Sequence, residues 1–339
     1  MINAFKKACP WWVKIPVARL SRTGIILMYH RVSELRPNHF CLNVSPKNFN
    51  DHMRIIKKYA KPLLMRQIGE NLKNLDLMHD QIAVTFDDGF VDNFHQAKPI
   101  LEKHEVPATF YISSHAMEYR EEFWWDKLSR LFNASSRFPE IFEMSINNTL
   151  CRWHIDENSL AKESCFLPPP DSVLSRTQFL FAIWRLIRPL SYEQQNVEID
   201  RILTWSGQTL GQPVYLPMTL DELKQMAGSR LVEIGAHTVH HPLLLAWGIK
   251  EQEEEISIGR QKLEHWINKK VTSFAYPFGE YSHDTLDIVE RLGFQNACTV
   301  TERAISRNMN PFLLPRFMVF DWDGDEFEKN LRYWLTRKD

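Results

Sequence analysis

The sequence lacks three features that would assign it to a familiar class at once. Its 41 Lys and Arg residues are balanced by 42 Asp and Glu residues, so it has no basic surplus of the kind that nucleic-acid-binding proteins carry. Its 5 cysteines are scattered, odd in number and without a Cys-x-x-Cys spacing, which argues against a disulfide framework or a thiolate zinc site. No segment approaches the roughly 20 apolar residues of a membrane span. We therefore expect a cytoplasmic protein that does not bind nucleic acid.

Residues 1–22 form a basic and aromatic segment of their own. Pro10 and Pro16 interrupt its short apolar stretches, so it lacks the continuous hydrophobic region of a signal peptide. Trp11 and Trp12 lie among several lysines and arginines, a combination typical of segments on anionic membrane surfaces. Two interpretations stay open: peripheral contact with the inner face of a membrane, or a tail that packs its tryptophans on the body of the protein.

Beyond this segment, short apolar runs alternate with amphipathic helical patterns. The expected strands are 23–30, 81–86, 107–113, 231–238, 271–279, 295–301 and 312–320. The expected helices are 45–60, 93–106, 219–227, the stretch after 249, 282–293 and 326–337. Strands that alternate with helices imply a parallel sheet or an α/β barrel.

The alternation stops between residues 117 and 214. This stretch is rich in aromatic residues, contains a triple proline at 168–170 and has no clean strand pattern, so we predict a mainly helical insertion that covers one side of the core. The expected organisation is a catalytic barrel of 23–116 and 215–339, interrupted by the insertion 117–214. Trp124, Trp125 and Trp153 are candidates for stacking on a sugar, and buried core positions are the plainer interpretation of each.

Two carboxylates stand side by side where the strand at 81–86 ends. Asp87 and Asp88 are followed by a glycine, and such a pair is costly unless a cation or a proton lies between the charges. His237 and His241 are four positions apart, so on a helical turn after the strand at 231–238 they would point the same way. With Asp88 as third ligand, they form a set that suits zinc or a similar divalent ion and leaves positions open for water and substrate.

Each motif alone has a plainer interpretation. The histidine pair could be two surface residues, and Asp87 could cap the helix that follows it. His240 is expected to be an exposed neighbour of the ligands. Together, at strand ends of one α/β chain, the motifs reinforce each other, because such folds build their sites at the carboxyl ends of parallel strands.

Three stretches resemble a known family. "TFDDG" at 85–89, "HTVHH" at 237–241 and "FAYPFG" at 274–279 are similar to the first three motifs of the polysaccharide deacetylases, the NodB-homology carbohydrate esterases of family 4, in order and spacing. "ILMYHRV" at 26–32 is similar to the opening strand of members related to the poly-N-acetylglucosamine deacetylases. The resemblance covers about 23–116 and 215–320, and it implies a deformed (β/α) barrel that hydrolyses the amide of an N-acetylated sugar with the help of a metal.

Carried over by position, the resemblance gives roles to individual residues. Asp87 would be the general base, and Asp88, His237 and His241 would bind one divalent ion, Zn²⁺ first, with Co²⁺, Ni²⁺ or Mn²⁺ as alternatives. That ion would lower the pKa of a water molecule to roughly 7 and polarise the acetyl carbonyl. The backbone N–H of Phe278 would stabilise the oxyanion, and Tyr276 in the same turn is a further candidate for substrate contact.

The sequence departs from the family pattern at two places. The third motif usually has an arginine two residues before the proline, to orient the base, and here that residue is Ala275. Arg316 is a candidate replacement from another strand, although an arginine at a strand end is more often a plain salt-bridge partner. The C-terminal Leu-x-Leu-His motif, whose histidine protonates the leaving amine, is not evident; His30 could supply this acid, or could be a hydrogen-bonded histidine at the barrel rim.

These observations predict a metal-dependent N-deacetylase that acts on an amino sugar of a surface polysaccharide or of a lipid-linked glycan precursor. One alternative is a deformylase or another amide hydrolase on a similar sugar. Another is a non-catalytic glycan-binding barrel within a glycan-assembly complex. The two departures favour the binding protein, and the intact "TFDDG" and histidine pair favour the enzyme, since a pure binder needs no base beside a metal ligand. The sequence does not indicate an oligomeric state.

Overall fold

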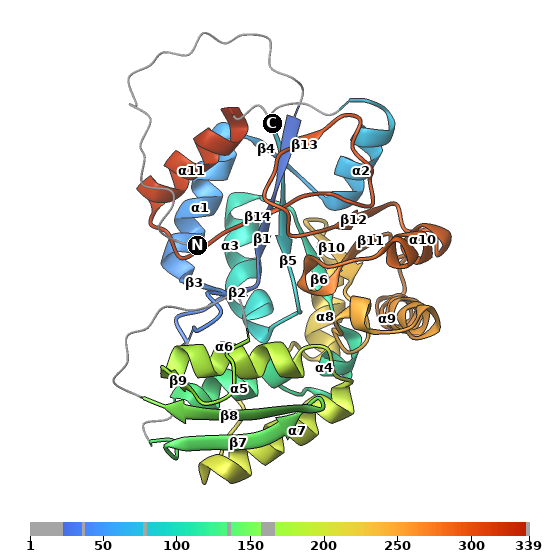
Figure 1. Cartoon of the computed structure of the whole chain (residues 1–339). Coiled ribbons are helices and arrows are strands. Elements are labelled where there is room, and N and C mark those ends of the chain that lie inside the picture. The colour runs from blue at the N-terminus through green and yellow to red at the C-terminus, as the bar shows by residue number, and fades with distance from the viewer. Residues whose placement is uncertain (1–22, 36–37, 77–79, 134–136, 157–166, 337–339) are drawn as a thin grey trace.

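A computed structural model describes residues 23–35, 38–76, 80–133, 137–156 and 167–336 (Figure 1). The basic and aromatic segment at 1–22 lies outside the described residues. The described chain forms a curled sheet wrapped by helices, with the insertion standing at one end of that sheet (Figure 1).

Six strands form the central parallel path of this sheet, in the order β12-β11-β10-β6-β5-β1. They are β1 (Thr23–Tyr29), β5 (Gln81–Phe86), β6 (Ala108–Ile112), β10 (Val232–Ala236), β11 (Ser273–Ala275) and β12 (Asn296–Cys298). Every residue of β5, β6 and β10 is buried, as expected for parallel strands covered on both faces. The expected parallel α/β arrangement is confirmed.

A short segment near the C-terminus joins the two edges of the curled sheet. The strand β14 (Phe317–Met318) pairs in parallel with Leu27 and Met28 of β1. Leu314, three residues earlier, forms a parallel bridge with Cys298 of β12. The segment therefore closes the sheet toward the deformed barrel that the resemblance implies, although only two residues of the expected strand at 312–320 are in β14.

Short strands extend the sheet at its rim. β4 (Lys61–Leu63) pairs with β5, and β13 (Ile305–Ser306) pairs antiparallel with the start of β1. A separate ribbon joins β2 (Arg31–Val32) to β3 (Asn43–Val44).

Helices cover the outside of the sheet where the sequence pattern places them. They are α1 (Pro46–Tyr59), the π-helical turn η1 (Asn93–Ala97) with α3 (Lys98–His104), α8 (Leu220–Gly228), α9 (Ile249–Ile267), α10 (His283–Arg291) and α11 (Gly324–Thr336). Ser45 caps α1, and Thr219 and Glu222 form the expected capping box at α8. The helices α2 (Met65–Lys73) and α4 (Ser114–Tyr119) were not predicted.

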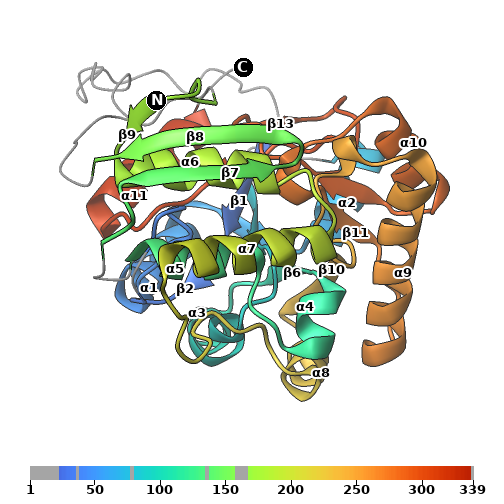
Figure 2. The ribbon, with the colours of Figure 1, turned by 60° about the horizontal axis from the view of Figure 1, so that its bottom comes forward.

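The insertion is a small layered unit below the carboxyl ends of the strands. It consists of α5 (Trp124–Asn133), β7 (Ile141–Ile146), β8 (Thr149–Ile155), β9 (Ser172–Leu174), α6 (Arg176–Ile187) and α7 (Tyr192–Ser206). In Figure 2, β7 and β8 run in nearly the same direction as α6, and α7 runs roughly parallel to them below. Helices make up most of its regular structure, and an aromatic core that includes Phe142, Trp153 and Phe179 holds it together.

The sheet β7-β8-β9 corrects the expectation that this stretch contains no strands. In β8 the buried residues Cys151, Trp153 and Ile155 alternate with more exposed ones, which is the pattern of a half-buried strand. Asn147 and Asn148 join β7 to β8 with φ angles of 48° and 58°, so the hairpin turns through two left-handed residues, as in a type I′ turn. The alternation and the Asn-Asn pair were therefore readable in the sequence.

Among the described residues, no helix combines the length and the apolar character needed to cross a bilayer.

Cys41, Cys151 and Cys298 are free thiols. Cys9 and Cys165 lie outside the described residues.

Candidate active site

The predicted site residues lie where strands of the sheet end. Asp87 and Asp88 follow β5, His237 follows β10, and His30 follows β1. Because neighbouring parallel strands end at the same edge of the sheet, these side chains meet there. The insertion faces this edge (Figure 1).

The Asp-Asp-Gly turn directs both carboxylates inward. Asp88 and Gly89 have φ angles of 75° and 83°, so the chain reverses sharply as soon as β5 ends. A Cβ atom on Gly89 would lie 2.9 Å from Cδ1 of Ile112, so the turn needs glycine for space as well as for conformation. Each aspartate is only 3% exposed.

The histidine pair lies in a loop and not on the helical turn that its spacing predicts. Residues 237–243 form no helix, and Thr238 and His241 have φ angles of 67° and 58°. The backbone N–H of His241 donates to Oγ1 of Thr238 over 3.0 Å, which folds the loop back on itself. The two imidazoles still face one site, because the two left-handed residues turn the chain as a helical turn would.

Asp88, His237 and His241 come together as predicted. Nε2 of His237 lies 3.6 Å from Oδ1 of Asp88, and Nε2 of His241 lies 3.5 Å from the same oxygen. The ligand atoms of all three residues lie within 4.8 Å of one another. The N–H at Nδ1 of His237 donates to the carbonyl oxygen of Ala275 over 2.7 Å, which leaves the Nε2 lone pair directed to the site.

The donor set fits a divalent metal ion. Oδ1 of Asp88 is buried and has no hydrogen-bond partner among the described residues. Burial and the neighbouring charge of Asp87 raise the pKa of Asp88 well above its usual range, so an ionised Asp88 needs a cation beside it. Two imidazole nitrogens and one carboxylate are ligands that zinc accepts in sites with open positions. The identity of the metal stays a prediction.

Arg316 reaches Asp87 from the segment that closes the barrel. Its guanidinium nitrogens donate to the two carboxylate oxygens over 2.7 and 2.8 Å. Its Nε donates to the carbonyl oxygen of Thr299 over 2.9 Å, and this bond fixes the orientation of the guanidinium group. The Arg316 side chain is 0% exposed. The structure thus brings together the two residues that the sequence analysis paired, and the contact is also the plain salt bridge of the alternative interpretation.

This pair keeps Asp87 ionised. Burial alone would raise its pKa, but the Arg316 guanidinium, together with His237, lowers the pKa well below the usual range of an aspartate. A carboxylate that stays charged at neutral pH can accept a proton. The observation agrees with the predicted role of a base, which remains a prediction.

His30 lines the same pocket as Asp87. Burial lowers the pKa of His30 to about 4, against the opposing charge of Asp87. The imidazole is therefore neutral at neutral pH, and it would have to gain a proton during the reaction before it could donate one. No histidine of β14 enters the pocket, where Met318 lies instead.

The pocket at this site has a volume of about 240 Å³. Apart from the acidic residues and histidines, its walls are mostly apolar, with Phe40, Trp125, Trp184 and Phe278 among them. Phe278 has a φ angle of 57°, and its ring packs edge-on against His241 with centroids 4.6 Å apart. Tyr276 also lines the pocket, while its hydroxyl donates to the carbonyl oxygen of Phe312 over 3.1 Å.

Of the three candidate tryptophans, Trp125 alone lines this pocket. Trp153 is 1% exposed in the core of the insertion, and its N–H donates to the carbonyl oxygen of Pro168 over 3.3 Å. Trp124 is likewise buried within that core. Phe40 and Trp184 are pocket residues that the sequence analysis missed, because a single aromatic residue in a loop or a helix gives no signal that separates a pocket wall from a core.

His240 differs from its expectation. Its side chain is 25% exposed, not free in solvent, and Nδ1 bonds to Oε1 of Glu255 on α9 over 2.6 Å. The ring also stacks on Tyr192 of the insertion, with centroids 5.2 Å apart. The loop that carries the histidine pair is thus held by α9 and by the insertion.

Comparison with protein families agrees with this geometry. The family described as polysaccharide deacetylase matches residues 76–137 and 196–297, and the unmatched stretch between them lies within the insertion. The chain belongs to the polysaccharide deacetylase family. The two matched ranges contain the aspartate pair and the histidine pair of this deacetylase-family chain.

Relatives of known sequence agree with the family. A Bacillus subtilis protein described as a putative polysaccharide deacetylase, YxkH, is 27% identical over 296 residues, which is 87% of this chain and 70% of that protein. A poly-beta-1,6-N-acetyl-D-glucosamine N-deacetylase of Staphylococcus aureus is 28% identical over 122 residues, which is 33% of this chain and 41% of that enzyme.

Two solved structures share the fold of this chain. The Streptococcus pyogenes deacetylase PplD, solved in complex with acetate, has a TM-score of 0.60 at 18% identity, over 94% of this chain and 100% of that one. IcaB from Ammonifex degensii has a TM-score of 0.58 at 16% identity, over 93% of this chain and 98% of that one. The barrel architecture expected for this family is confirmed.

Proposed function

We propose that this family member is a metal-dependent amide hydrolase that removes the N-acetyl group from an amino sugar of a surface polysaccharide or of a lipid-linked glycan precursor. The observation that carries the proposal is the bidentate Asp87–Arg316 pair beside the cluster of Asp88, His237 and His241, with Asp87 and the cluster lining one pocket. A base next to a metal-ligand set is what hydrolysis of an unreactive amide requires.

Asp87 accepts the proton of the attacking water in this proposal. Arg316 holds both carboxylate oxygens, so it fixes the direction of the base and keeps it ionised. Asp88, His237 and His241 would hold the divalent ion, which supplies Lewis-acid polarisation of the carbonyl and a water of lowered pKa. The backbone N–H of Phe278, in the turn that borders the pocket, stabilises the oxyanion.

The leaving amine must take up a proton before the carbon–nitrogen bond breaks. His30 lines the pocket, but it is neutral in the resting site, so in this proposal it first takes from Asp87 the proton that Asp87 removed from the water, and then passes it to the leaving amine. The variant His30→Gln tests the role, since it keeps a polar side chain of similar size. Turnover unchanged from the wild type in metal-loaded protein would eliminate His30 as the acid.

The pocket walls agree with a sugar substrate. Aromatic rings pack against the apolar faces of a pyranose, and Trp125 and Trp184 line the pocket. A volume of about 240 Å³ is small, so only part of a longer glycan enters it. For location we propose the cytoplasm, on the grounds of the scattered cysteines.

Acetate release from N-acetylated glucosamine oligomers tests the proposal. We expect release by the wild type with one equivalent of Zn²⁺ and a loss of roughly 100-fold or more in Asp87→Asn. Formate release from an N-formylated analogue at a higher rate would instead establish the deformylase. Saturable binding of oligomers without any released acid, in metal-loaded protein, would leave the glycan-binding barrel as the function.

A further inference from the structure

Helix α9 supports the back of the loop that carries the histidine pair. Gly259 of α9 touches the loop so closely that a Cβ atom at this position would lie 2.7 Å from the carbonyl carbon of Thr238. The backbone of α9 therefore packs directly against the backbone of the loop, and the loop cannot move toward α9. A shift in α9 would therefore move the loop as well.

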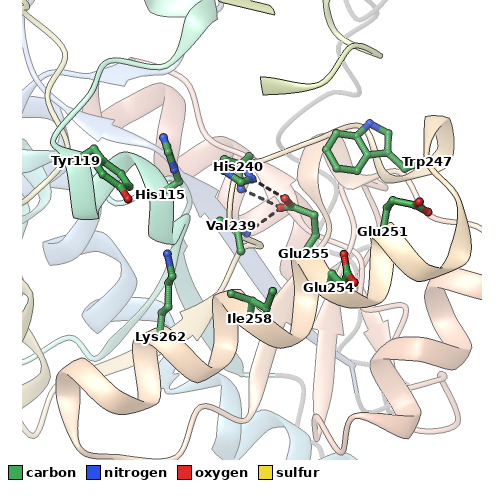
Figure 3. Close-up of a pocket in the computed structure, with 10 residues that line it drawn as sticks. All are labelled: His115, Tyr119, Val239, His240, Trp247, Glu251, Glu254, Glu255, Ile258 and Lys262. Carbon is green, nitrogen blue, oxygen red and sulfur yellow. Dashed lines mark hydrogen bonds and ion pairs between the residues drawn. The ribbon is translucent and has the colours of Figure 1, made fainter. Parts of the chain in front are cut away.

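The carboxylate of Glu255, one turn before Gly259, is bonded to the same loop three times (Figure 3). Oε2 accepts the backbone N–H of Val239 over 3.0 Å and that of His240 over 2.9 Å. Oε1 accepts from Nδ1 of His240 over 2.6 Å. Glu255 is 6% exposed, so these bonds form away from bulk water, where charge-assisted bonds are strong.

The loop has a conformation that needs such support. Thr238 and His241 have positive φ angles, in a region that L-residues disfavour. On the opposite side, the N–H groups of Ser114 and His115 donate to the carbonyl oxygens of Thr238 and Val239 over 3.1 and 2.9 Å. Glu255 binds the loop's N–H groups, while α4 binds its carbonyl groups.

A cavity of about 460 Å³ lies beside Glu255 and shares no lining residue with the catalytic pocket. Figure 3 shows its walls, formed by α4, by α9 and by the loop at Val239 and His240. Glu254 lines this cavity as well, but the ion pair that it forms is with Lys250, over 3.7 Å. Glu254 is therefore a matched control for Glu255, with the same side chain on the same helix.

We propose that Glu255 is a positioning residue of the metal site. Its three bonds hold the loop in the conformation that turns His237 and His241 toward Asp88. Glu255 acts through the loop and touches neither the ligand atoms nor the substrate. The inference rests on one part of the proposed function, the binding of a divalent ion by these three residues.

Titration of the metal-free full chain with Co²⁺, followed by its visible absorption, tests this role. We expect Glu255→Ala to raise the Kd on the order of 10- to 100-fold, the usual effect of removing a residue that orients metal ligands. Glu255→Gln should recover part of the affinity, because an amide oxygen still accepts an N–H without the charge. Glu254→Gln should bind as the wild type does.

Amide hydrogen exchange in the metal-free protein gives a second readout. The N–H groups of Val239 and His240 should exchange faster in Glu255→Gln than in the wild type, while those of Ser114 and His115 should keep most of their protection. This comparison holds even if Glu255→Ala does not fold. A merely structural role would lower the melting temperature without changing the Kd measured well below it.

The outcomes separate the inference from the proposed function. Wild-type Kd in both Glu255 variants, or unchanged exchange at Val239 and His240, would overturn it. An equal loss of affinity in Glu254→Gln would overturn it too, since the effect would then come from general charge. If the wild type binds no Co²⁺ or Zn²⁺, the metal proposal and this inference fail together; if it binds metal but releases no acetate, the proposed reaction alone fails.

Discussion

Arg316 offers the sharpest test of how this site is held, because its contact with Asp87 can be measured without a substrate. Both groups are buried, and removal of one partner from a buried ion pair costs about 3–5 kcal/mol, since the other charge stays without compensation. We expect Arg316→Met to lower the free energy of unfolding by about that amount at pH 7. Asp87→Asn should cost less, because the amide can still accept from the guanidinium.

A double-mutant cycle isolates the pair itself. The combined variant Asp87→Asn, Arg316→Met removes both charges, so it should be more stable than the sum of the single variants predicts, by about 1–3 kcal/mol. The four proteins are compared by urea unfolding in the absence of metal. Additivity within about 0.5 kcal/mol would refute the claim that Arg316 acts through Asp87.

The stability that ionised Asp87 contributes depends on pH in a direction that can be worked out. The folded-state pKa of Asp87 is lowered, so its ionised form stabilises the fold above the unfolded pKa of about 4. That stabilisation is lost as pH falls through the folded pKa. In Arg316→Met the pKa of Asp87 should rise, because burial then acts without opposition, and the acid limb of any pH–rate profile should move to higher pH.

Three further results are expected. Burial lowers the pKa of His52 to about 4, so the unfolded state binds a proton first as pH falls, and His52 should account for a loss of about 2–3 kcal/mol of stability between pH 7 and 4.5 in urea unfolding. His52→Gln should remove this share of the pH dependence and leave the share of His30, whose pKa is lowered to the same value. Trp184→Ala should raise KM for a glycan roughly 2- to 10-fold with little change in kcat, measured by steady-state kinetics; an unchanged KM would exclude Trp184 as a sugar platform. Gly89→Ala should lower the free energy of unfolding by about 1–3 kcal/mol. Gly207→Ala, also at positive φ but with nothing within 4 Å of its Cβ, should cost less; equal losses would contradict the steric argument.

Local patterns predicted most of the barrel from the sequence. The strand β5 and the helices α1 and α8 follow directly from apolar runs, periodicity and capping residues. The hairpin of β7 and β8 was missed because an aromatic-rich stretch between helices looked helical as a whole, although its alternation was present. A closer count of period two against period 3.6 would have found it.

Contacts between distant segments explain what the sequence could not predict in the site. The histidine spacing led to the right partners through the wrong local structure, since a loop with two left-handed residues replaced the helical turn. Arg316 was only a candidate, because its contact with Asp87 depends on how the last segment closes the barrel. Phe40 and Trp184 reach the pocket through the packing of the insertion, which no local pattern encodes.

The closure of the barrel by 314–318 also determines when the site can exist during synthesis. The proposed metal ligands and the groups that orient them, Glu255 and the carbonyl of Ala275, have all been made once residue 275 has been added, whereas Arg316 follows 41 positions later. If the proposed function holds, a nascent chain would therefore assemble its metal-ligand set before Asp87 gains its partner from the closing segment. Competence for the proposed hydrolysis would then arise only after residue 316 has been added, so a chain cut short between these two points would hold the metal-ligand set without an oriented base.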